Sequence, residues 1–146
     1  MYSKHHLVVS LALGALFVLA VDSSLPLWFV LAYSAVVGVG IDFDHFLVAR
    51  VNTGSWRAAR ECLLNPTRVF AGQDEIFEDG EVGTLRRLLS HVVVVGVAVP
   101  ALVLVSPALA LLTAVVLYGH LLADLVWDVY LEIENGSPEV PNVVRR

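Results

Sequence analysis

The sequence predicts an all-α integral membrane protein, in which four transmembrane helices form two hairpins and together a bundle. Composition is the first reason: the 146 residues are 58% hydrophobic and 16% charged, whereas soluble domains are roughly 45–50% apolar and about 25% charged. Grouping is the second reason, because the apolar residues form four runs close to the roughly 20 residues that a helix needs to cross a bilayer. A long polar segment separates the second run from the third.

The four helices are expected at about residues 6–21, 25–45, 86–105 and 107–128, in one domain that covers residues 1–131. The polar break Asp22-Ser23-Ser24 separates the first two helices, and Ser106-Pro107 separates the last two. Such short connections imply two helical hairpins. Pro100 is expected to kink the third helix, since a proline inside a helix removes a backbone hydrogen bond.

The polar segment at about residues 46–85 is expected to form a long loop between the hairpins. Trp56 to Leu64 is the candidate for a short interfacial helix, which ends before Pro66 because the residue before a proline disfavours helix. Residues 132–146 are polar and predict a tail outside the bundle. The loop also holds an acidic cluster that we expect to be solvated: Asp74, Glu75, Glu78, Asp79 and Glu81.

The basic residues predict the orientation. Lys4 precedes the first helix, six arginines lie in or beside the loop and Arg145-Arg146 close the chain, while the short connections hold no lysine or arginine. Basic residues favour the cytoplasmic side, so both termini and the loop are expected there, in a multi-pass protein of the inner or plasma membrane. An alternative takes the first two dozen residues as a cleaved signal peptide. The apolar runs predict the lipid bilayer as partner, whereas the net charge of −5 argues against nucleic acid.

Histidine and aspartate residues stand where lipid-facing helices should be apolar. All five histidines lie in the apolar runs or at their edges. A carboxylate at mid-helix costs about 2.5–3.5 kcal/mol on insertion scales, so residues of this kind usually have a function. With the predicted orientation, all four helices bring such groups to one level, on the cytoplasmic side. The candidate metal ligands are His6, Asp42, Asp44, His45, His91, His120 and Asp124.

Residue spacing supports a common site. His120 and Asp124 are four residues apart and share a helix face, as do Asp42 and His45, which are three apart. Asp44 points elsewhere on a regular helix, unless the end of the second helix is unwound. Imidazole nitrogens and carboxylate oxygens are ligands for divalent metal ions, with Zn²⁺ expected first and Mn²⁺ or Fe²⁺ after it. The number of ions stays open.

Four sequence motifs resemble one known family. They are His6-Leu7-Val8-Val9-Ser10, Asp42-Phe43-Asp44-His45, Arg87-Leu88-Leu89-Ser90-His91 and Tyr118-Gly119-His120-Leu121-Leu122-Ala123-Asp124. In order and placement they are similar to the membrane-bound metal-dependent hydrolase family, described as YdjM-like, LexA-binding inner-membrane hydrolases. The resemblance extends over about residues 5–128. It implies a metal site, and it fits His6 better than His5, which the spacing alone does not separate.

The chain departs from the family pattern at several motif positions. Ile41 stands in place of a proline, and Arg86 in place of the first histidine of the third motif, while Leu88 replaces a glycine. If the missing histidine is a ligand or an acid in relatives, this chain is expected either to bind one metal ion fewer or to be less active. No recognition motif supports the association with LexA here.

The expected function is a membrane-embedded metal-dependent hydrolase that acts on a lipid or another amphiphilic ester, with a phosphoester preferred. Asp44 or Asp42 is the expected general base, and Arg87 is expected to offset negative charge on the substrate. Asp128 stays open as either a ligand or an interfacial residue. The alternatives are a scaffold or binding protein with a structural metal, and a small metal or proton transporter. A transporter would need polar groups in the outer half, where only Tyr33, Ser34 and Thr113 occur.

Overall fold

The computed structural model describes residues 2–69, 72, 75–78 and 80–134, and this part of the chain is all-helical, without strands. The predicted all-α class is therefore confirmed. Four helical segments are long and apolar enough to cross a membrane. Their bounds are Ser3–Ala20, Leu27–Thr53, Thr84–Val103 and Pro107–Glu134.

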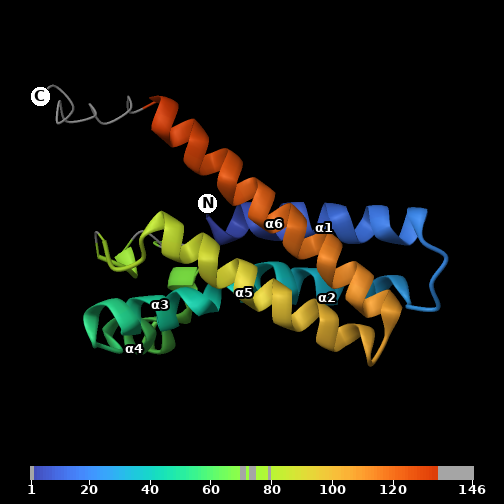
Figure 1. Cartoon of the computed structure of the whole chain (residues 1–146), viewed down its shortest axis with the longest axis horizontal. Coiled ribbons are helices and arrows are strands. Elements are labelled where there is room, and N and C mark those ends of the chain that lie inside the picture. The colour runs from blue at the N-terminus through green and yellow to red at the C-terminus, as the bar shows by residue number, and fades with distance from the viewer. Residues whose placement is uncertain (1, 70–71, 73–74, 79, 135–146) are drawn as a thin grey trace, which may run out of the picture.

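The first two helices pack closely because small side chains line their contact. α1 (Ser3–Ala20) and α2 (Leu27–Gly40) follow one another and lie side by side (Figure 1). A Cβ added to Gly38 would lie 1.8 Å from the Ser10 Oγ, and one added to Gly14 would lie 2.6 Å from the Ser34 Oγ. Each helix thus carries two small residues four positions apart, a pattern that lets helix backbones approach each other in membranes.

The second membrane-length segment changes its helical geometry in the middle. α2 ends at Gly40, the 3₁₀ turn η1 covers Ile41–Phe43, and α3 continues over Asp44–Thr53. Gly54 ends α3 with a φ of 73°, the left-handed conformation that glycine adopts at helix ends. The helix was expected to end near residue 45. It continues because the polar side chains at residues 42–45 turn into the bundle, so they do not mark a hydrated helix end.

The polar segment after α3 folds back onto it. α4 (Arg57–Leu64) is the short helix expected at Trp56 to Leu64, while its interfacial position stays a prediction; the 3₁₀ turn η2 (Pro66–Val69) follows. Ala58, Cys62 and Ile76 are buried together, next to Phe46, Val69 and Phe77. Within the acidic cluster, Glu81 is buried and its Oε2 lies 2.9 Å from Nη2 of Arg57, so this residue was wrongly expected to be solvated. Asp74 and Asp79 lie outside the described residues.

The last two helices complete the bundle. α5 (Thr84–Val103) runs through Pro100 and packs on α6 and α3, while α6 (Pro107–Glu134) packs on α1, α2 and α5. α6 extends six residues beyond the expected end at residue 128, so residues 132–134 belong to it and not to the tail. The predicted tail from residue 135 onward, with Arg145-Arg146, lies outside the described residues.

The hydrophobic core and the polar residues occupy different halves of the bundle. Phe17, Val30, Leu112 and Val116 form the buried cluster between α1, α2 and α6. These residues lie toward the α1–α2 connection and the α5–α6 turn, which share one end of the molecule in Figure 1. The N-terminus, α3 and α4 lie at the opposite end, where the histidines and aspartates gather.

Candidate metal centre

Five structural elements bring the predicted ligands together. His6 comes from α1, Asp42 from η1, His91 from α5, and both His120 and Asp124 from α6. Asp44 and His45 come from the first turn of α3. Six of the seven predicted ligands form two groups, in each of which the candidate ligand atoms lie within 4.8 Å of one another. The groups are His6, Asp42, His120 and Asp124, and Asp42, His45 and His91.

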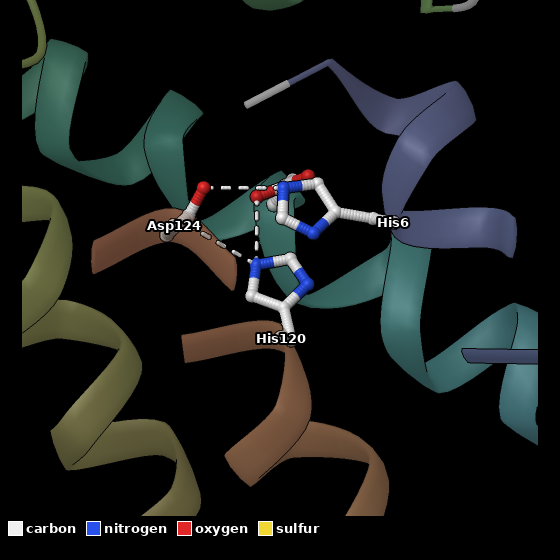
Figure 2. A group of neighbouring side chains, drawn as sticks. His6, His120 and Asp124 are labelled. Carbon is white, nitrogen blue, oxygen red and sulfur yellow. Dashed lines mark ion pairs between the residues drawn. The ribbon is translucent and has the colours of Figure 1, made fainter. Parts of the chain in front are cut away.

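The first group joins α1, η1 and α6. Figure 2 shows His6 and His120 side by side with the Asp124 carboxylate turned toward both. Nε2 of His6 lies 3.2 Å from one carboxylate oxygen of Asp124, and Nε2 of His120 lies 3.5 Å from the other. Nε2 of His120 is also 3.4 Å from Oδ1 of Asp42. The two imidazole rings are stacked with centroids 3.7 Å apart, so their ring nitrogens face the same space.

The second group shares Asp42 with the first. Oδ1 of Asp42 lies 3.5 Å from Nε2 of His91 and 3.6 Å from Nε2 of His45. The rings of His45 and His91 are stacked with centroids 5.1 Å apart. Asp42 therefore lies between two sets of candidate ligands. Three of them, on α1 and α6, belong to the first group, and two, on α3 and α5, belong to the second.

These separations match those of atoms that bind one ion. Zinc bonds to nitrogen and oxygen are about 2.0–2.2 Å long, and tetrahedral geometry then places two ligand atoms roughly 3.4 Å apart. The contacts between the Nε2 atoms and the carboxylate oxygens of the two groups range from 3.2 to 3.7 Å. Most are longer than ordinary nitrogen–oxygen hydrogen bonds, which are 2.7–3.2 Å.

Hydrogen bonds on the far side of two rings direct them toward the centre. Nδ1 of His120 lies 2.8 Å from the carbonyl oxygen of Gly38, and a carbonyl can only accept, so Nδ1 carries the proton. Nδ1 of His91 is 2.8 Å from Oδ2 of Asp44, to which it donates. In both rings Nε2 is left as a lone-pair donor aimed at the centre, the arrangement that orients histidines at metal sites.

The 3₁₀ turn explains how the second helix supplies several groups. On a regular α-helix Asp44 would point away from the face that holds Asp42 and His45. The tighter turn at Ile41–Phe43 changes the rotation per residue, since a 3₁₀ helix has three residues per turn instead of 3.6. The Asp44 carboxylate then reaches His91. Asp44 belongs to neither ligand group of the described residues, and its contact is with the back of a ligand ring.

The centre is buried and rich in polar atoms that lack hydrogen bonds. His6, His91, His120 and Asp124 are each at most 1% exposed. Within the described residues, the Nε2 atoms of all four histidines, Oδ2 of Asp42 and Oδ1 of Asp44 are buried without a hydrogen-bond partner. Each such atom costs about 1–3 kcal/mol in desolvation, and neighbouring carboxylates repel each other. A divalent cation would bind the unpaired atoms and offset the repulsion between the carboxylates, and this set of nitrogen and oxygen donors fits such a cation.

Arg87 and Asp128 lie at the edge of the centre. The guanidinium of Arg87 is hydrogen-bonded to the Asp128 carboxylate, and its Nε lies 3.8 Å from Oδ2 of Asp124. Asp128 is thus a partner of Arg87 and is not in either ligand group.

His5 and His6 face different surroundings. His5 contacts the rings of Tyr2 and Trp127, whereas His6 is 1% exposed and reaches the centre.

The folded loop covers one side of the centre. Phe77 packs edge-on against the ring of His45 and contacts Phe46, and Ile76 beside it is 2% exposed. These two loop residues also line a small cavity with Asp42 and His45. The loop therefore limits access from that side.

Sequence reasoning named the ligands but missed the backbone acceptor at Gly38. The signal for it is indirect: a glycine in α2, four residues after Ser34, where α1 and α6 both approach closely.

No protein-family model, curated protein or solved structure matches this chain. The resemblance to YdjM-like hydrolases stays a prediction that rests on the four motifs.

Proposed function

We propose that this protein is a membrane-embedded metal-dependent hydrolase whose centre lies at the cytoplasmic side of the inner or plasma membrane. One observation carries the proposal: four buried histidine Nε2 atoms without hydrogen bonds converge on the carboxylates of Asp42 and Asp124, while the Nδ1 atoms of His91 and His120 are engaged elsewhere. A buried arrangement of this kind has a clear physical reason if cations bind there.

The proposed orientation follows from the basic residues of the described chain. The connection at residues 21–26 and the turn at residues 104–106 contain no lysine or arginine, and we propose that they are the outer ends of two hairpins. The basic residues are at the other end of the bundle, which the positive-inside rule favours on the cytoplasmic side. They are Lys4, Arg50, Arg57, Arg60, Arg68, Arg86 and Arg87.

We propose two metal ions, with Asp42 as the ligand that they share. Asp42 is the only residue common to both described ligand groups, and its Oδ1 lies within 3.6 Å of three histidine Nε2 atoms. Nitrogen and carboxylate donors in roughly tetrahedral spacing favour Zn²⁺, with Mn²⁺ or Fe²⁺ as alternatives. Bound divalent ions would lower the pKa of a coordinated water toward neutrality and so supply the nucleophile.

The aspartates then have separate roles. Asp42 and Asp124 hold the metal, while Asp44 stays outside both groups and keeps a buried Oδ1 without a hydrogen bond. Asp44 is therefore the proposed general base, because its Oδ1, which lies 3.7 Å from Nε2 of His45 without a hydrogen bond, can accept the proton of the attacking water. Arg87 already balances Asp128 and approaches Asp124, so we propose that it positions a ligand and does not touch the substrate.

The membrane-length helices around the centre favour an amphiphilic substrate, and a phosphoester is the proposed class. Its ester oxygen would reach the centre beside Asp44, and the folded loop with Phe77 would exclude water from the other side.

Metal content is the first test. Zinc, manganese and iron are measured by elemental analysis in detergent-purified wild type and in three variants: His120→Ala, Asp44→Asn and the matched control Asp128→Asn. We expect two ions per wild-type chain, loss of at least one in His120→Ala, and near-complete retention in the other two. Each variant is accepted only if it elutes as wild type in size-exclusion chromatography.

The outcomes separate the metal site from the reaction. A folded wild type that takes up no added Zn²⁺, Mn²⁺ or Fe²⁺ contradicts the proposal. Hydrolysis of a chromogenic long-chain phosphodiester, lost in Asp44→Asn with its metal retained, supports the general base. Retained metal with no turnover on lipid esters would favour the scaffold with a structural metal.

A further inference from the structure

A groove between α3 and α5 runs alongside the metal centre. It encloses about 730 Å³ and combines a few polar residues with an apolar wall. Its lining consists of Asp44, Leu47, Val48, Val51, Asn52, Arg86, Leu89, Ser90, Val93 and Val94. The residue numbers give its direction: Asn52 lies near the C-terminal end of α3 and Arg86 near the N-terminal end of α5, whereas Asp44 and Ser90 lie at the level of His91.

The walls of the groove are suited to hydrocarbon. Leu47 and Val51 on α3 are 59% and 84% exposed, and Leu89 and Val93 on α5 are 64% and 56% exposed. These side chains belong to two membrane-length segments. In a bilayer, an apolar groove in such segments would contact acyl chains, against which its exposure carries no hydrophobic penalty.

At the end of the groove formed by Asn52 and Arg86, the positive charge of Arg86 is not neutralised by a carboxylate of the described residues. The guanidinium of Arg86 donates to the amide oxygen of Asn52 and forms no ion pair with a carboxylate of the described residues. Its neighbour Arg87 is paired with Asp128.

The inner end of the groove touches the metal centre through one side chain. Asp44 lines the groove, and its Oδ2 accepts a hydrogen bond from Nδ1 of His91, whose Nε2 belongs to the second ligand group. Asp44 and Asn52 are eight residues apart, about 12 Å along a helix. That distance is shorter than one leaflet of the hydrocarbon core, which is about 15 Å thick.

We propose that this groove admits a phospholipid with an anionic headgroup sideways from the membrane, and that Arg86 selects for that headgroup. The headgroup lies on Arg86 and Asn52, one acyl chain lies along Leu47, Leu89 and Val93, and the ester region lies beside Asp44. The proposal deepens the proposed hydrolase and rests on it for turnover, but lipid binding itself requires no metal.

Lipid photo-crosslinking tests the groove directly. The full chain is placed in phosphatidylcholine nanodiscs that contain a trace of diazirine-labelled phosphatidylglycerol or, in parallel, labelled phosphatidylcholine. One arginine near a membrane surface favours an anionic lipid by about 1 kcal/mol, which is roughly fivefold. We therefore expect the preference for phosphatidylglycerol to fall about fivefold in Arg86→Gln and to be retained in Arg86→Lys. Arg60→Gln, another exposed arginine without an ion pair in the described residues, is expected to leave it unchanged.

A second pair of variants tests the place of binding. Leu89→Trp fills the groove and is expected to reduce crosslinking of both lipids at least fivefold. Val97→Trp on the same helix, 67% exposed and outside the groove lining, is expected to leave it unchanged.

Each result decides a separate claim. Equal labelling of both lipids by wild type, or an unchanged preference in Arg86→Gln, overturns headgroup selection by Arg86. Equal labelling of Leu89→Trp and Val97→Trp overturns the groove as the binding place. Elemental analysis of the same nanodiscs reports the metal centre independently, so a metal-free chain that still selects phosphatidylglycerol contradicts the hydrolase and leaves the groove intact.

Discussion

Substitution of Gly38 by alanine should separate α1 from α2 and disturb the candidate metal centre at the same time. The added Cβ would lie 1.8 Å from Oγ and 2.6 Å from Cβ of Ser10, and 3.3 Å from a methyl group of Val116. Ordinary contact begins near 3.4 Å, so the Ser10 Cβ is about 0.8 Å too close. A rotamer change can move Oγ but not Cβ, and the helix backbones therefore have to shift. Overpacking of this kind costs about 1–3 kcal/mol.

The control for this prediction lies two residues away. A Cβ added to Gly40 would meet nothing within 4 Å, so Gly40→Ala should be neutral or slightly stabilising. Unfolding is measured by titrating detergent-solubilised protein with SDS and following circular dichroism. The carbonyl of Gly38 also accepts from Nδ1 of His120, so Gly38→Ala should bind added Zn²⁺ more weakly as well.

Ser10→Gly provides the decisive comparison. It removes both atoms that the new Cβ would strike, and the double variant Ser10→Gly/Gly38→Ala should regain most of the lost stability. Equal stability of Gly38→Ala and Gly40→Ala, or no rescue in the double variant, would refute the close-packing argument.

Two further predictions concern the opposite ends of the bundle. Oη of Tyr33 lies 2.7 Å from Oγ1 of Thr113, which itself donates to the Leu109 carbonyl. Tyr33 is therefore the donor, and Tyr33→Phe should cost about 0.5–1.5 kcal/mol in the same SDS titration, a result that an unchanged midpoint would contradict. In the folded loop, burial raises the pKa of the Cys62 thiol. Below that pKa the thiol stays protonated, so maleimide should label it slowly at pH 7 and faster as the pH rises. A Cys62→Ala/Leu63→Cys variant, with an 81% exposed position, should react quickly; equal rates would show that Cys62 is accessible.

Membrane helices were predictable because their signal is local. An apolar run of about 20 residues is informative on its own, and all four expected runs became helices of membrane length. The ends were less predictable where polar side chains face the bundle. Residues 42–45 resemble the end of a helix in sequence, yet the chain continues as α3 to Thr53, because those side chains turn inward.

The candidate site, like the helices, was predictable where the signal is local and not where it depends on contacts between helices. Its residues could be named from the sequence because histidine and aspartate are costly in an apolar helix. Their roles could not be assigned, since these depend on contacts between helices. The direction of Asp44 depends on the 3₁₀ turn before it, and the acceptor of His120 is a backbone carbonyl of Gly38.

The polar groups of the described residues do not form a continuous pathway along the bundle. A pathway for ions needs polar groups or water along its whole length. Toward the α1–α2 connection, the interior is filled by Phe17, Val30, Leu112 and Val116. The hydroxyls of Tyr33 and Thr113 in that half are already bonded to each other and to the Leu109 carbonyl, and Ser34 packs against Gly14. The candidate metal centre is therefore closed toward that end, while Asp42 and His45 line a small cavity and Asp44 lines the groove between α3 and α5. Access from one side is compatible with the proposed hydrolase, which would bind its substrate and release its product on the same side.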